Sequence, residues 1–469
     1  MPIIPDTDVS QYAVTRGRFD NKRVASMLTG ILGTEIFSRL RKAKVDERMM
    51  FGSNPYYLSL AMGGGLRDSS GDLVLPPMPP SQALLALILP KVEETTDLAG
   101  EKDPSNQLRY SPLTSKGRLI HKYDEVVLAH CAVACSAHCR YCFRLDLFNK
   151  STGKALASPE EITHYIETYN GTVPSTHSPS ESTNPRHRIT EVLLSGGDPL
   201  ILTNAGLHSY LAAAARATIN LVRIGTKELA FRPQRIDRDF TNMLRVFHTD
   251  YPEVHLVFVV HFTHPDEFLE RGDDNSYLRD DLGYYRWLSG VSTALALLLD
   301  LPFVTIENQT PIIAGVNDNS QALHLLHEEL RRKGVRSKYT LQCRDIEGHS
   351  SFAVPIETAW QIHNDSQRGL SDEARSRLVM STEWGKLEIV SVLDDACATT
   401  LLNSSYSGPA APPGLVVFKL YRSPSTAIDQ GALLIARRNP TARWITGYTD
   451  RIVYDGRHEA NRSSAKPTA

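Results

Sequence analysis

Residues 191–217 read EVLLSGGDPLILTNAGLHSYLAAAARA, and this stretch decides the fold. It begins with a short apolar run at residues 191–194, passes through a turn with two adjacent glycines, and continues as a helix over residues 205–217. A short apolar run followed by a helical pattern is typical of a β-then-α unit, in which the helix lies outside a parallel sheet. The stretch therefore predicts an α/β protein if the same unit recurs along the chain.

The unit recurs six times between residues 125 and 366. Predicted strands cover residues 125–129, 191–194, 220–224, 255–261, 303–308 and 337–342. Predicted helices cover residues 159–169, 205–217, 237–247, 285–299, 320–333 and 356–366. Six units are too few for a standard eight-fold barrel, so they predict an open, partial (βα)6 TIM-like barrel with its chemistry at the carboxyl ends of the strands.

The regions on either side of this core differ from it in their predicted secondary structure and order. Residues 1–120 are predicted to form a helical N-terminal region, with helical spacing at residues 23–41 and a short helix at residues 81–89. The partial barrel is expected over residues 121–350, and a C-terminal region over residues 351–455. A segment rich in Ser, Thr and Pro, residues 171–188, and the polar tail, residues 456–469, are both predicted to be disordered.

The overall charge and hydropathy exclude two classes of protein. The chain of 469 residues has 51 Lys and Arg against 53 Asp and Glu, a formal net charge of −2. This balance argues against a protein that binds nucleic acid through a strong overall positive charge. No apolar run reaches the ~18 residues needed to span a bilayer, and the N-terminal residues lack the pattern of a secretory signal. We therefore expect a cytoplasmic protein without nucleic-acid or membrane partners; homo-oligomer formation is compatible with the sequence.

Three cysteines point to the chemistry. Cys135, Cys139 and Cys142 form a C-x3-C-x2-C pattern directly after the first predicted core strand. Thiolates are soft ligands that suit iron–sulfur clusters or zinc. A structural zinc site normally has four protein ligands, and Cys131 is the candidate fourth ligand for such a site. Three thiolates on a four-iron cluster would instead leave one iron open to another molecule. Both interpretations stay open at this point.

The cysteines and eight motifs, one of which contains Cys139 and Cys142, resemble in their order along the chain the radical S-adenosylmethionine (SAM) superfamily and within it the lysine 2,3-aminomutase family. The motifs are HKY (121–123), CRYCFR (139–144), LLSGGDPL (193–200), VRIGT (222–226), PQRI (233–236), VHFTHPDE (260–267), NQTPIIAGVND (308–318) and YTLQC (339–343). The resemblance runs from about residue 121 to residue 390, over half of the chain. It implies a [4Fe-4S] cluster, SAM, pyridoxal 5′-phosphate (PLP) and a reductant such as flavodoxin or ferredoxin.

The resemblance also implies an activity. In the family, SAM bound at the open iron is split into methionine and a 5′-deoxyadenosyl radical. The radical removes a hydrogen from the β-carbon of an amino acid that is held as an imine on PLP, and the α-amino group then moves to the β-carbon. We therefore expect an isomerase, an amino-acid 2,3-aminomutase, in which SAM is a recycled coenzyme. The chain's tasks would be to position the reactants and to exclude water from the radical.

Site residues follow from matching the family's motifs onto this sequence. Cys135, Cys139 and Cys142 are implied as cluster ligands. Contacts with SAM are implied for the GGD turn, which consists of Ser195, Gly196, Gly197 and Asp198. They are also implied for three positions at predicted strand ends, Arg223, His261 and Gln309. In the turn, the glycines would let the backbone approach a ligand and Asp198 would supply an anionic acceptor.

Residues for PLP match the family less well. Lys122 and Tyr123 match positions near the PLP phosphate, but the family has arginine at the first of these and a second arginine at the position of Val126. The family's Schiff-base lysine follows a run of glycines that this sequence lacks. Lys386, in the segment TEWGKLEIV, is the best candidate for that lysine.

The predicted substrate pocket departs from the lysine enzymes. Arg144 matches the arginine that binds the substrate α-carboxylate, for which a guanidinium is well suited. Where those enzymes have an aspartate that holds the substrate ammonium, this chain has Arg344, followed by Asp345; near their second aspartate, the only acid is Glu383. An arginine would repel a substrate ammonium in a desolvated site. Either Asp345 turns into the site or the substrate side chain is anionic or neutral, and we favour the second.

Three alternatives remain from the sequence alone. The chain could be a radical SAM enzyme that has lost PLP and acts on another substrate, such as a lysine of a protein. It could be a non-catalytic binding protein stabilised by zinc or by a cluster. A degenerate homologue that keeps the cluster but makes no product is the third alternative.

Overall fold

The computed structural model describes residues 51–63, 78–144, 156–173, 187–395, 397, 414–424 and 431–457. The predicted helix at residues 23–41 lies outside these residues. The same holds for residues 174–186 of the predicted insertion and for residues 458–469 of the predicted tail. Among the described helices, none combines the length and the apolar character needed to cross a membrane.

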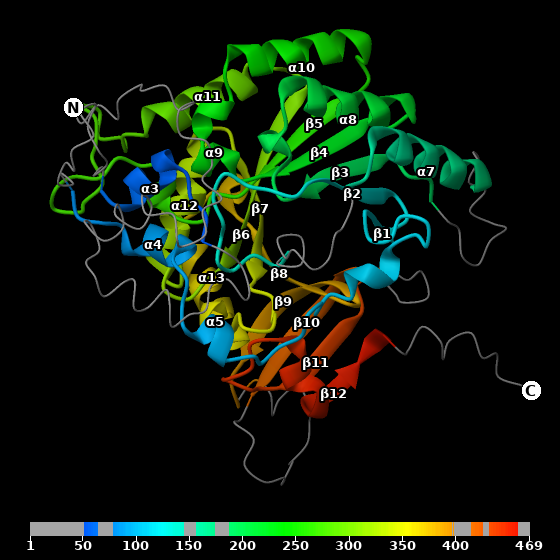
Figure 1. Cartoon of the computed structure of the whole chain (residues 1–469). Helices are drawn as coiled ribbons and strands as arrows, with labels where there is room; N and C mark the ends of the chain where they lie inside the picture. Colours follow the sequence, from blue (N-terminus) through cyan, green and yellow to red (C-terminus); the bar gives the residue numbers. More distant parts are fainter. Residues whose placement is uncertain are drawn as a thin grey trace, which may run out of the picture.

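A single sheet of 12 strands, ordered as they occur in the chain, forms the centre of the molecule (Figure 1). β1 is antiparallel to β2, the strands from β2 to β8 are all parallel, and those from β8 to β12 are antiparallel. The strands are β1 (Leu119–Tyr123), β2 (Val126–Ala132), β3 (Glu191–Gly196), β4 (Leu221–Thr226), β5 (His255–Val260), β6 (Val304–Ile312), β7 (Arg336–Gln342), β8 (Arg377–Thr382), β9 (Gly385–Leu393), β10 (Leu415–Arg422), β11 (Leu433–Arg437) and β12 (Ile452–Asp455).

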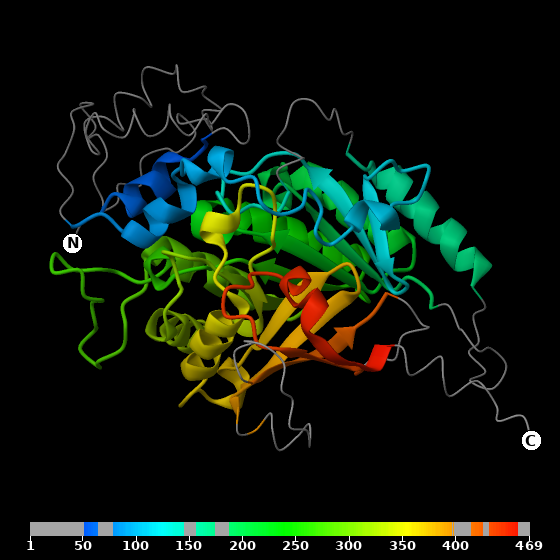
Figure 2. The ribbon, with the colours of Figure 1, turned by 90° about the horizontal axis from the view of Figure 1, so that it is seen from below.

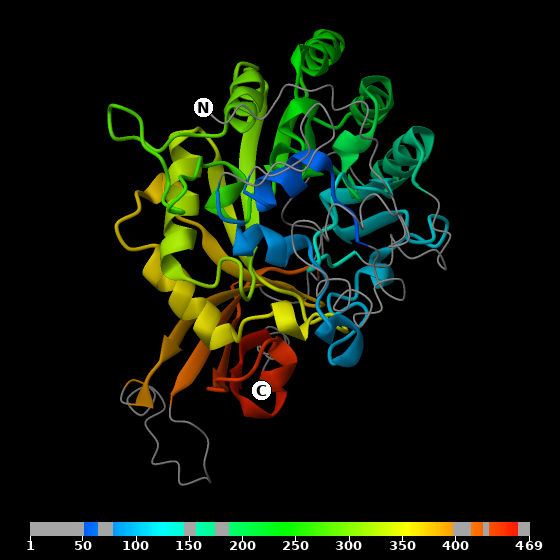
Figure 3. The same cartoon turned by 60° about the vertical axis from the view of Figure 1, so that its left-hand side comes forward.

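A helix follows each of the parallel strands from β2 to β7, and these helices form an arc around the sheet (Figure 3). They are α7 (Pro159–Thr172), α8 (Asn204–Arg216), α10 (Arg238–Asp250), α11 (Ser289–Leu299), α12 (Ser320–Arg332) and α13 (Ile356–Ser366). The six predicted β-then-α units and the partial barrel are therefore confirmed. The structure adds a further parallel strand, β8, and the antiparallel extension β9–β12, which the sequence analysis did not predict.

Burial explains why the core strands were recognisable. β5 reads HLVFVV, and its Leu256, Phe258 and Val260 are fully buried between the helices and the barrel interior. Parallel strands covered on both faces are expected to be apolar in this way. Helix α12 begins after an N-cap in which the Asn319 side chain accepts from the Ala322 amide. Local signals of this kind set the boundaries of most core elements.

The predicted helix over residues 285–299 is shorter in the structure. Residues 269–288 form an arm, in which Leu269 bridges Trp287 and Arg279 bridges Tyr285. Because these bridges hold residues 285–288 in extended backbone, α11 begins only at Ser289. The arm projects from the body of the molecule beside α11 and α12 (Figure 2).

Three short N-terminal helices pack on the barrel: α3 (Pro55–Ala61), α4 (Gln82–Ile88) and α5 (Glu93–Thr96). In Figure 3, α3 and α4 lie in front of the strands, inside the arc of outer helices. Tyr57 donates to Glu267 at 2.7 Å and Ser81 donates to Asp266 at 2.5 Å, both in the segment that follows β5. The N-terminal helices are thus attached to the carboxyl end of the barrel, where the predicted motifs lie.

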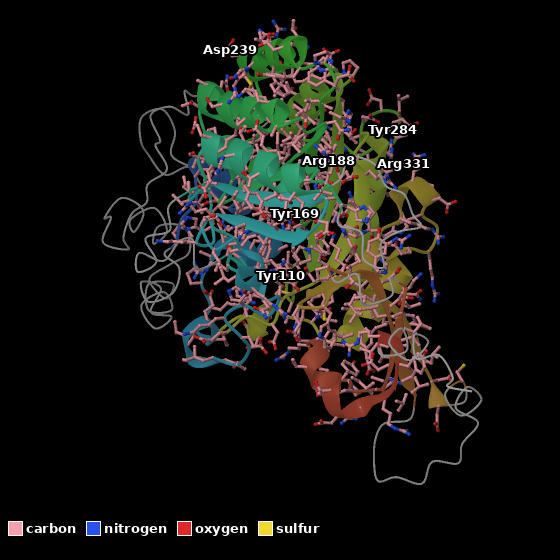
Figure 4. All side chains as sticks on the ribbon, turned by 90° about the vertical axis from the view of Figure 1, so that its right-hand side faces the viewer. Tyr110, Tyr169, Arg188, Asp239, Tyr284 and Arg331 are labelled. Atoms are coloured by element: carbon pink, nitrogen blue, oxygen red, sulfur yellow. The ribbon has the colours of Figure 1, made fainter. Side chains whose placement is uncertain are left out.

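β1 forms one edge of the sheet. There the ring of His121 lies 4.5 Å from that of Tyr169 on α7, and His121 Nδ1 is 2.8 Å from the Tyr165 hydroxyl. Figure 4 looks at this side of the molecule, with Tyr169 and Tyr110 labelled. The first residue of the HKY motif therefore fixes β1 against α7, while the next two residues, Lys122 and Tyr123, belong to the candidate site described below.

Candidate active site

The three cysteines lie in the loop after β2, at the carboxyl end of the barrel. Its backbone is held from two sides: the His138 amide donates to Gly52 at 2.7 Å and the Arg140 amide donates to Leu87 at 2.8 Å. The amide and hydroxyl of Ser136 both donate to the buried carboxylate of Glu228, the first residue of α9 (Glu228–Phe231). The loop is thus fixed between the N-terminal helices and α9.

An ion pair between the cysteine motif and helix α5 also holds the loop in place. The Arg140 guanidinium is buried and donates to the Glu94 carboxylate on α5 at 3.2 and 2.5 Å. Breaking a buried pair of this kind by removing one partner typically costs about 3–5 kcal/mol. The position of the loop between Cys139 and Cys142 therefore depends on α5, a helix that the sequence analysis did not connect to the site.

The surroundings of the thiols fit a polynuclear metal group. Burial raises the pKa of Cys139 to about 12 and the pKa of Cys135 well above its usual value. Such thiols ionise readily only when a metal cation binds the thiolate. Among the described residues, no three His, Cys, Asp or Glu side chains surround a single point as ligands of one ion would. In a [4Fe-4S] cluster each thiolate binds a different iron, so such a cluster does not need the three sulfurs to surround one point.

Cys131 does not join the triplet. It is fully buried in β2, and its thiol donates to the Ser195 carbonyl at 3.4 Å. Burial raises its pKa to about 12. The described residues therefore do not assemble the four-thiolate zinc site that was the alternative interpretation of the cysteines.

The two glycines of the GGD turn serve the cysteine loop. A Cβ added at Gly196 (φ +119°) would lie 2.2 Å from the Ala132 carbonyl oxygen, and one at Gly197 would lie 2.3 Å from that of Ala134. The Gly197 amide donates to Ala132 at 2.6 Å, and the Asp198 amide donates to Ala134 at 2.8 Å. We expected these glycines to let the backbone approach a ligand; the close approach in the structure is to the backbone of the cysteine loop.

Replacing Gly197 with alanine should therefore displace the cysteine loop. We expect a loss of about 1–3 kcal/mol in the free energy of unfolding, as in other overpacked sites, together with reduced iron incorporation. Gly171→Ala is the matched control, because a Cβ there meets nothing within 4 Å. Iron per chain after anaerobic reconstitution and the thermal unfolding midpoint would measure both effects, and full iron content in the Gly197 variant would contradict the expectation.

Asp198 is already engaged by protein donors. Its carboxylate accepts from the Thr226 hydroxyl at 2.8 Å and from the amides of Lys227 and Leu200 at 2.6 and 3.0 Å. Burial, followed by the nearby Glu228 carboxylate, raises its pKa to about 7. In the structure Asp198 ties the end of β3 to the end of β4. Its predicted contact with SAM, like that of Ser195, stays a prediction.

Of the three other residues predicted to contact SAM, His261 contacts a residue of the cysteine motif, Tyr141. Its Nε2 is 2.9 Å from the Tyr141 hydroxyl, and the two rings stack at 5.9 Å. Burial, then the positive charge of Lys227, lowers the pKa of His261 to about 3, so the imidazole is neutral. Lys227 donates to the His261 carbonyl at 2.6 Å and to Glu267 at 2.6 Å. This buried network supports the cysteine loop from the end of β5.

Arg223 and Gln309 lie inside strands rather than at their ends. Arg223 is the third residue of β4, and its Nε is 2.9 Å from the Glu191 carboxylate on β3. Gln309 is half-buried in β6 and pairs in register with Tyr339 on β7. The description of both as strand-end residues was wrong, because β4 and β6 extend further than predicted. Their predicted contacts with SAM stay predictions.

Lys386 lies in a second group of charged side chains, around the second residue of β9. Its ammonium is 4.0 Å from the centre of the Tyr339 ring, a cation–π distance. Burial, followed by the positive charges of Arg223, Arg422 and Lys338, lowers the pKa of Lys386 to about 7, while Glu191 opposes the shift. The lysine with the predicted Schiff-base role is thus a half-buried amine whose lowered pKa makes it largely neutral just above neutral pH.

The other residues predicted for PLP lie around the same strands. Tyr123 packs under Arg422 of β10, with 4.0 Å between the guanidinium carbon and the ring centre, and Arg422 pairs in register with Lys386. Lys122 donates to the Thr382 carbonyl at 2.7 Å, and burial, then Arg344, lowers its pKa to about 8. Sequence reasoning missed Arg422, because no motif marks the C-terminal extension that supplies it.

Arg144 and Arg344 come together on one aromatic ring. Their guanidinium carbons are 4.8 and 4.0 Å from the centre of the Phe143 ring. Arg144 Nη1 is 2.6 Å from His130 Nε2. With its amide oxygen turned toward Arg344, Gln107 accepts from both terminal nitrogens at 2.6 and 3.1 Å. Burial, then the charge of Arg144, lowers the pKa of Arg344 to about 10.

Asp345 is influenced by other charged groups than this pair of arginines. Its carbonyl accepts from the Glu101 amide at 3.0 Å, and the charged groups that influence its carboxylate are Arg443 and Asp97. Its predicted contact with a substrate ammonium stays a prediction. Glu383, the other acid considered, contributes its carbonyl to the Tyr110 hydroxyl at 3.3 Å.

Comparisons with known proteins show which enzymes the chain resembles. The chain is 28% identical over 413 residues to a protein of Aquifex aeolicus provisionally named an L-lysine 2,3-aminomutase, covering 87% of this chain and 90% of that protein. It is 26% identical over 311 residues to the L-lysine 2,3-aminomutase of Clostridium subterminale (66% of this chain, 60% of that protein). It is 22% identical over 321 residues to the glutamate 2,3-aminomutase of Clostridioides difficile (68% and 62%).

Two other comparisons add little. No protein-family model matches the sequence. A radical SAM methyltransferase structure from Sphaerobacter thermophilus aligns with 57% of this chain and 72% of its own, at 13% identity and a TM-score of 0.34, a likeness too slight to carry an argument. The chain is thus similar over most of its length to a protein named as an aminomutase, and these relatives support an enzyme of the isomerase class that resembles the lysine 2,3-aminomutases.

Proposed function

We propose that the protein is an amino-acid 2,3-aminomutase that uses SAM, a [4Fe-4S] cluster on Cys135, Cys139 and Cys142, and PLP on Lys386. The observation that carries the proposal is the half-buried amine of Lys386, 4.0 Å from the ring centre of Tyr339 on β7 of a barrel whose carboxyl end bears the cysteine loop. The cluster with SAM would supply a carbon radical, and PLP would supply a carbonyl to which amines can be linked. A flavodoxin or ferredoxin would supply the electron.

The first task of the chain is to present a neutral amine. Protonated lysine cannot attack a carbonyl, and burial together with Arg223 and Arg422 disfavours the protonated form of Lys386. The Tyr339 ring lies against the amine and fixes its direction. The arginines and Lys122, although several are paired with carboxylates or carbonyls, make this end of the barrel suitable for a phosphate group.

The second task is to orient the substrate and exclude water. Arg144 follows the last cluster cysteine by two residues, so a carboxylate bound to its guanidinium would lie close to the cluster. Within the same motif, the Tyr141 hydroxyl and the neutral His261 share a hydrogen bond, and Lys227, Glu267 and Tyr57 form a buried network next to them. Such a packed surround protects a carbon radical from quenching.

The pH dependence of PLP uptake tests the environment of Lys386. Its ordinary pKa of 10.5 is lowered to about 7, so the reactive neutral amine should already be the main form near pH 8. We expect the amount of PLP that borohydride fixes to Lys386 to rise with pH, with a midpoint near 7. Peptide mapping by mass spectrometry would measure it. A midpoint above about 9, close to the reference value for lysine, would contradict the described burial.

A trapping experiment tests the proposed function. Anaerobically reconstituted protein is incubated with PLP, reduced with borohydride and digested, and a PLP adduct on Lys386 is expected. The same protein, chemically reduced and supplied with SAM and the twenty common amino acids, is expected to form a β-amino acid. SAM cleavage without either result would favour a PLP-independent radical enzyme, and zinc in place of iron would eliminate the radical chemistry altogether.

A further inference from the structure

We infer that Arg344 binds the side-chain carboxylate of an acidic amino acid, aspartate or glutamate, whose α-carboxylate is bound by Arg144. This inference rests on the proposed function and specifies its substrate class. The geometry that carries it is the convergence of two guanidiniums, from the end of the cysteine motif and from the segment after β7, on the single ring of Phe143.

The charge of this site points to an anionic ligand. Two half-buried guanidiniums near one another repel, and the ammonium of Lys122 adds a third positive charge that acts on Arg344. Among the described residues, no carboxylate forms an ion pair with Arg344, and its recorded partners are the Gln107 amide and the Phe143 ring. A ligand with two carboxylates would relieve the repulsion, whereas the ammonium of a lysine substrate would increase it.

The orientation of Arg344 leaves donors for such a ligand. Gln107 accepts one hydrogen bond from each terminal nitrogen. A guanidinium carries five N–H donors, so three remain for a carboxylate. The Phe143 ring restricts the position of the guanidinium further, because planar guanidiniums stack on aromatic faces. Arg344 is thus held by two neutral groups while its charge stays uncompensated.

The nearby acids do not provide an alternative. Asp345 is influenced by Arg443 and Asp97, and Asp103 acts on Arg344 only from beyond ion-pair distance in the described structure. The PLP phosphate is the other anion in the proposed reaction, and besides Lys122 the groups around Lys386 that would attract it are Arg223, Arg422 and Lys338. The two anions would therefore share Lys122 but depend on different arginines, which an experiment can separate.

The test combines direct binding with turnover. Equilibrium dialysis of radiolabelled glutamate, aspartate and lysine against the reconstituted, PLP-loaded protein measures affinity without any reaction. We expect binding of an acidic amino acid and none of lysine. In Arg344→Asp, affinity for the acidic amino acid and its kcat/KM should fall by at least about 30-fold, mainly through KM, as for other lost partners of buried charge pairs. PLP content should stay unchanged.

Two further variants complete the test. Arg331→Asp, a charge reversal at an exposed position of α12, is the matched control and should behave as wild type. Arg344→Lys keeps the charge and should retain part of the affinity, which separates the loss of charge from misfolding. Tight binding of lysine or a neutral amino acid by the wild type, or unchanged acidic-substrate affinity in Arg344→Asp, would overturn the inference. Conversion of lysine to a β-amino acid would overturn the inference about Arg344 but leave the proposed aminomutase function standing. Binding of an acidic amino acid without any β-amino acid product would instead count against the proposed function.

Discussion

Alanine at any one of Cys135, Cys139 and Cys142 should lower SAM cleavage by more than about 100-fold, since even outer-shell partners of metal ligands contribute 10–100-fold. Two thiolates cannot hold a four-iron cluster in the position that leaves one iron open to SAM. The thiols also sit where burial disfavours free thiolates, so the site depends on the metal for its charge. Iron content, the visible absorption of the anaerobic protein and 5′-deoxyadenosine formation under reduction would measure the loss.

Cys131→Ala is the control for this prediction. Cys131 lies on the strand that leads into the cysteine loop, and its buried thiol contacts only the protein interior. The variant should keep its iron and cleave SAM, with a stability cost of about 1 kcal/mol for the lost thiol packing and hydrogen bond. If the three loop variants keep iron and activity while Cys131→Ala loses them, the assignment of the ligands is wrong.

Lys386→Ala should reduce formation of β-amino acids by at least about 1,000-fold, as expected when a covalent catalytic group is removed. Lys386→Arg should be equally inactive, although it keeps a positive charge, because a guanidinium does not form the required link to a carbonyl. Both variants should retain the cluster, since Lys386 lies on β9 and the cysteine loop is fixed by α5 and α9. Product chromatography, iron content and PLP absorbance would separate these effects.

The control for Lys386 is another lysine of the same sheet. Lys419 lies on the neighbouring strand β10 and pairs in register with Glu388. Lys419→Ala should therefore bind PLP and form product as the wild type does. Product formation by Lys386→Ala near the wild-type rate would show that another group holds PLP, or that the reaction does not use it.

Local patterns in the sequence predicted the barrel because they coincide with its physical requirements. Buried parallel strands such as β5 are apolar throughout, and α12 begins at an asparagine cap. The patterns failed where a distant segment decides the outcome. The bridge between Leu269 and Trp287 shortens α11, and the extension β9–β12 completes the sheet with alternating antiparallel strands whose order no local signal encodes.

The candidate site shows the same division. The cysteine spacing was readable because all three residues lie in one loop, whereas the Arg140–Glu94 ion pair joins residues 46 positions apart. The glycines of the GGD turn were recognised as sites of close backbone approach, but only the structure shows that the cysteine loop is what they approach. Likewise, the sequence placed Arg344 beside Asp345, and only the structure shows that Arg344 lies on the Phe143 ring together with Arg144.

One measurement tests the central claim most directly: the products formed when the reduced, iron-loaded protein is given SAM, PLP and isotopically labelled amino acids. An amino-acid 2,3-aminomutase should yield a β-amino acid that keeps the nitrogen label of its α-amino precursor, while SAM is regenerated rather than consumed. Steady consumption of SAM to 5′-deoxyadenosine with no labelled β-amino acid from any precursor would contradict the account.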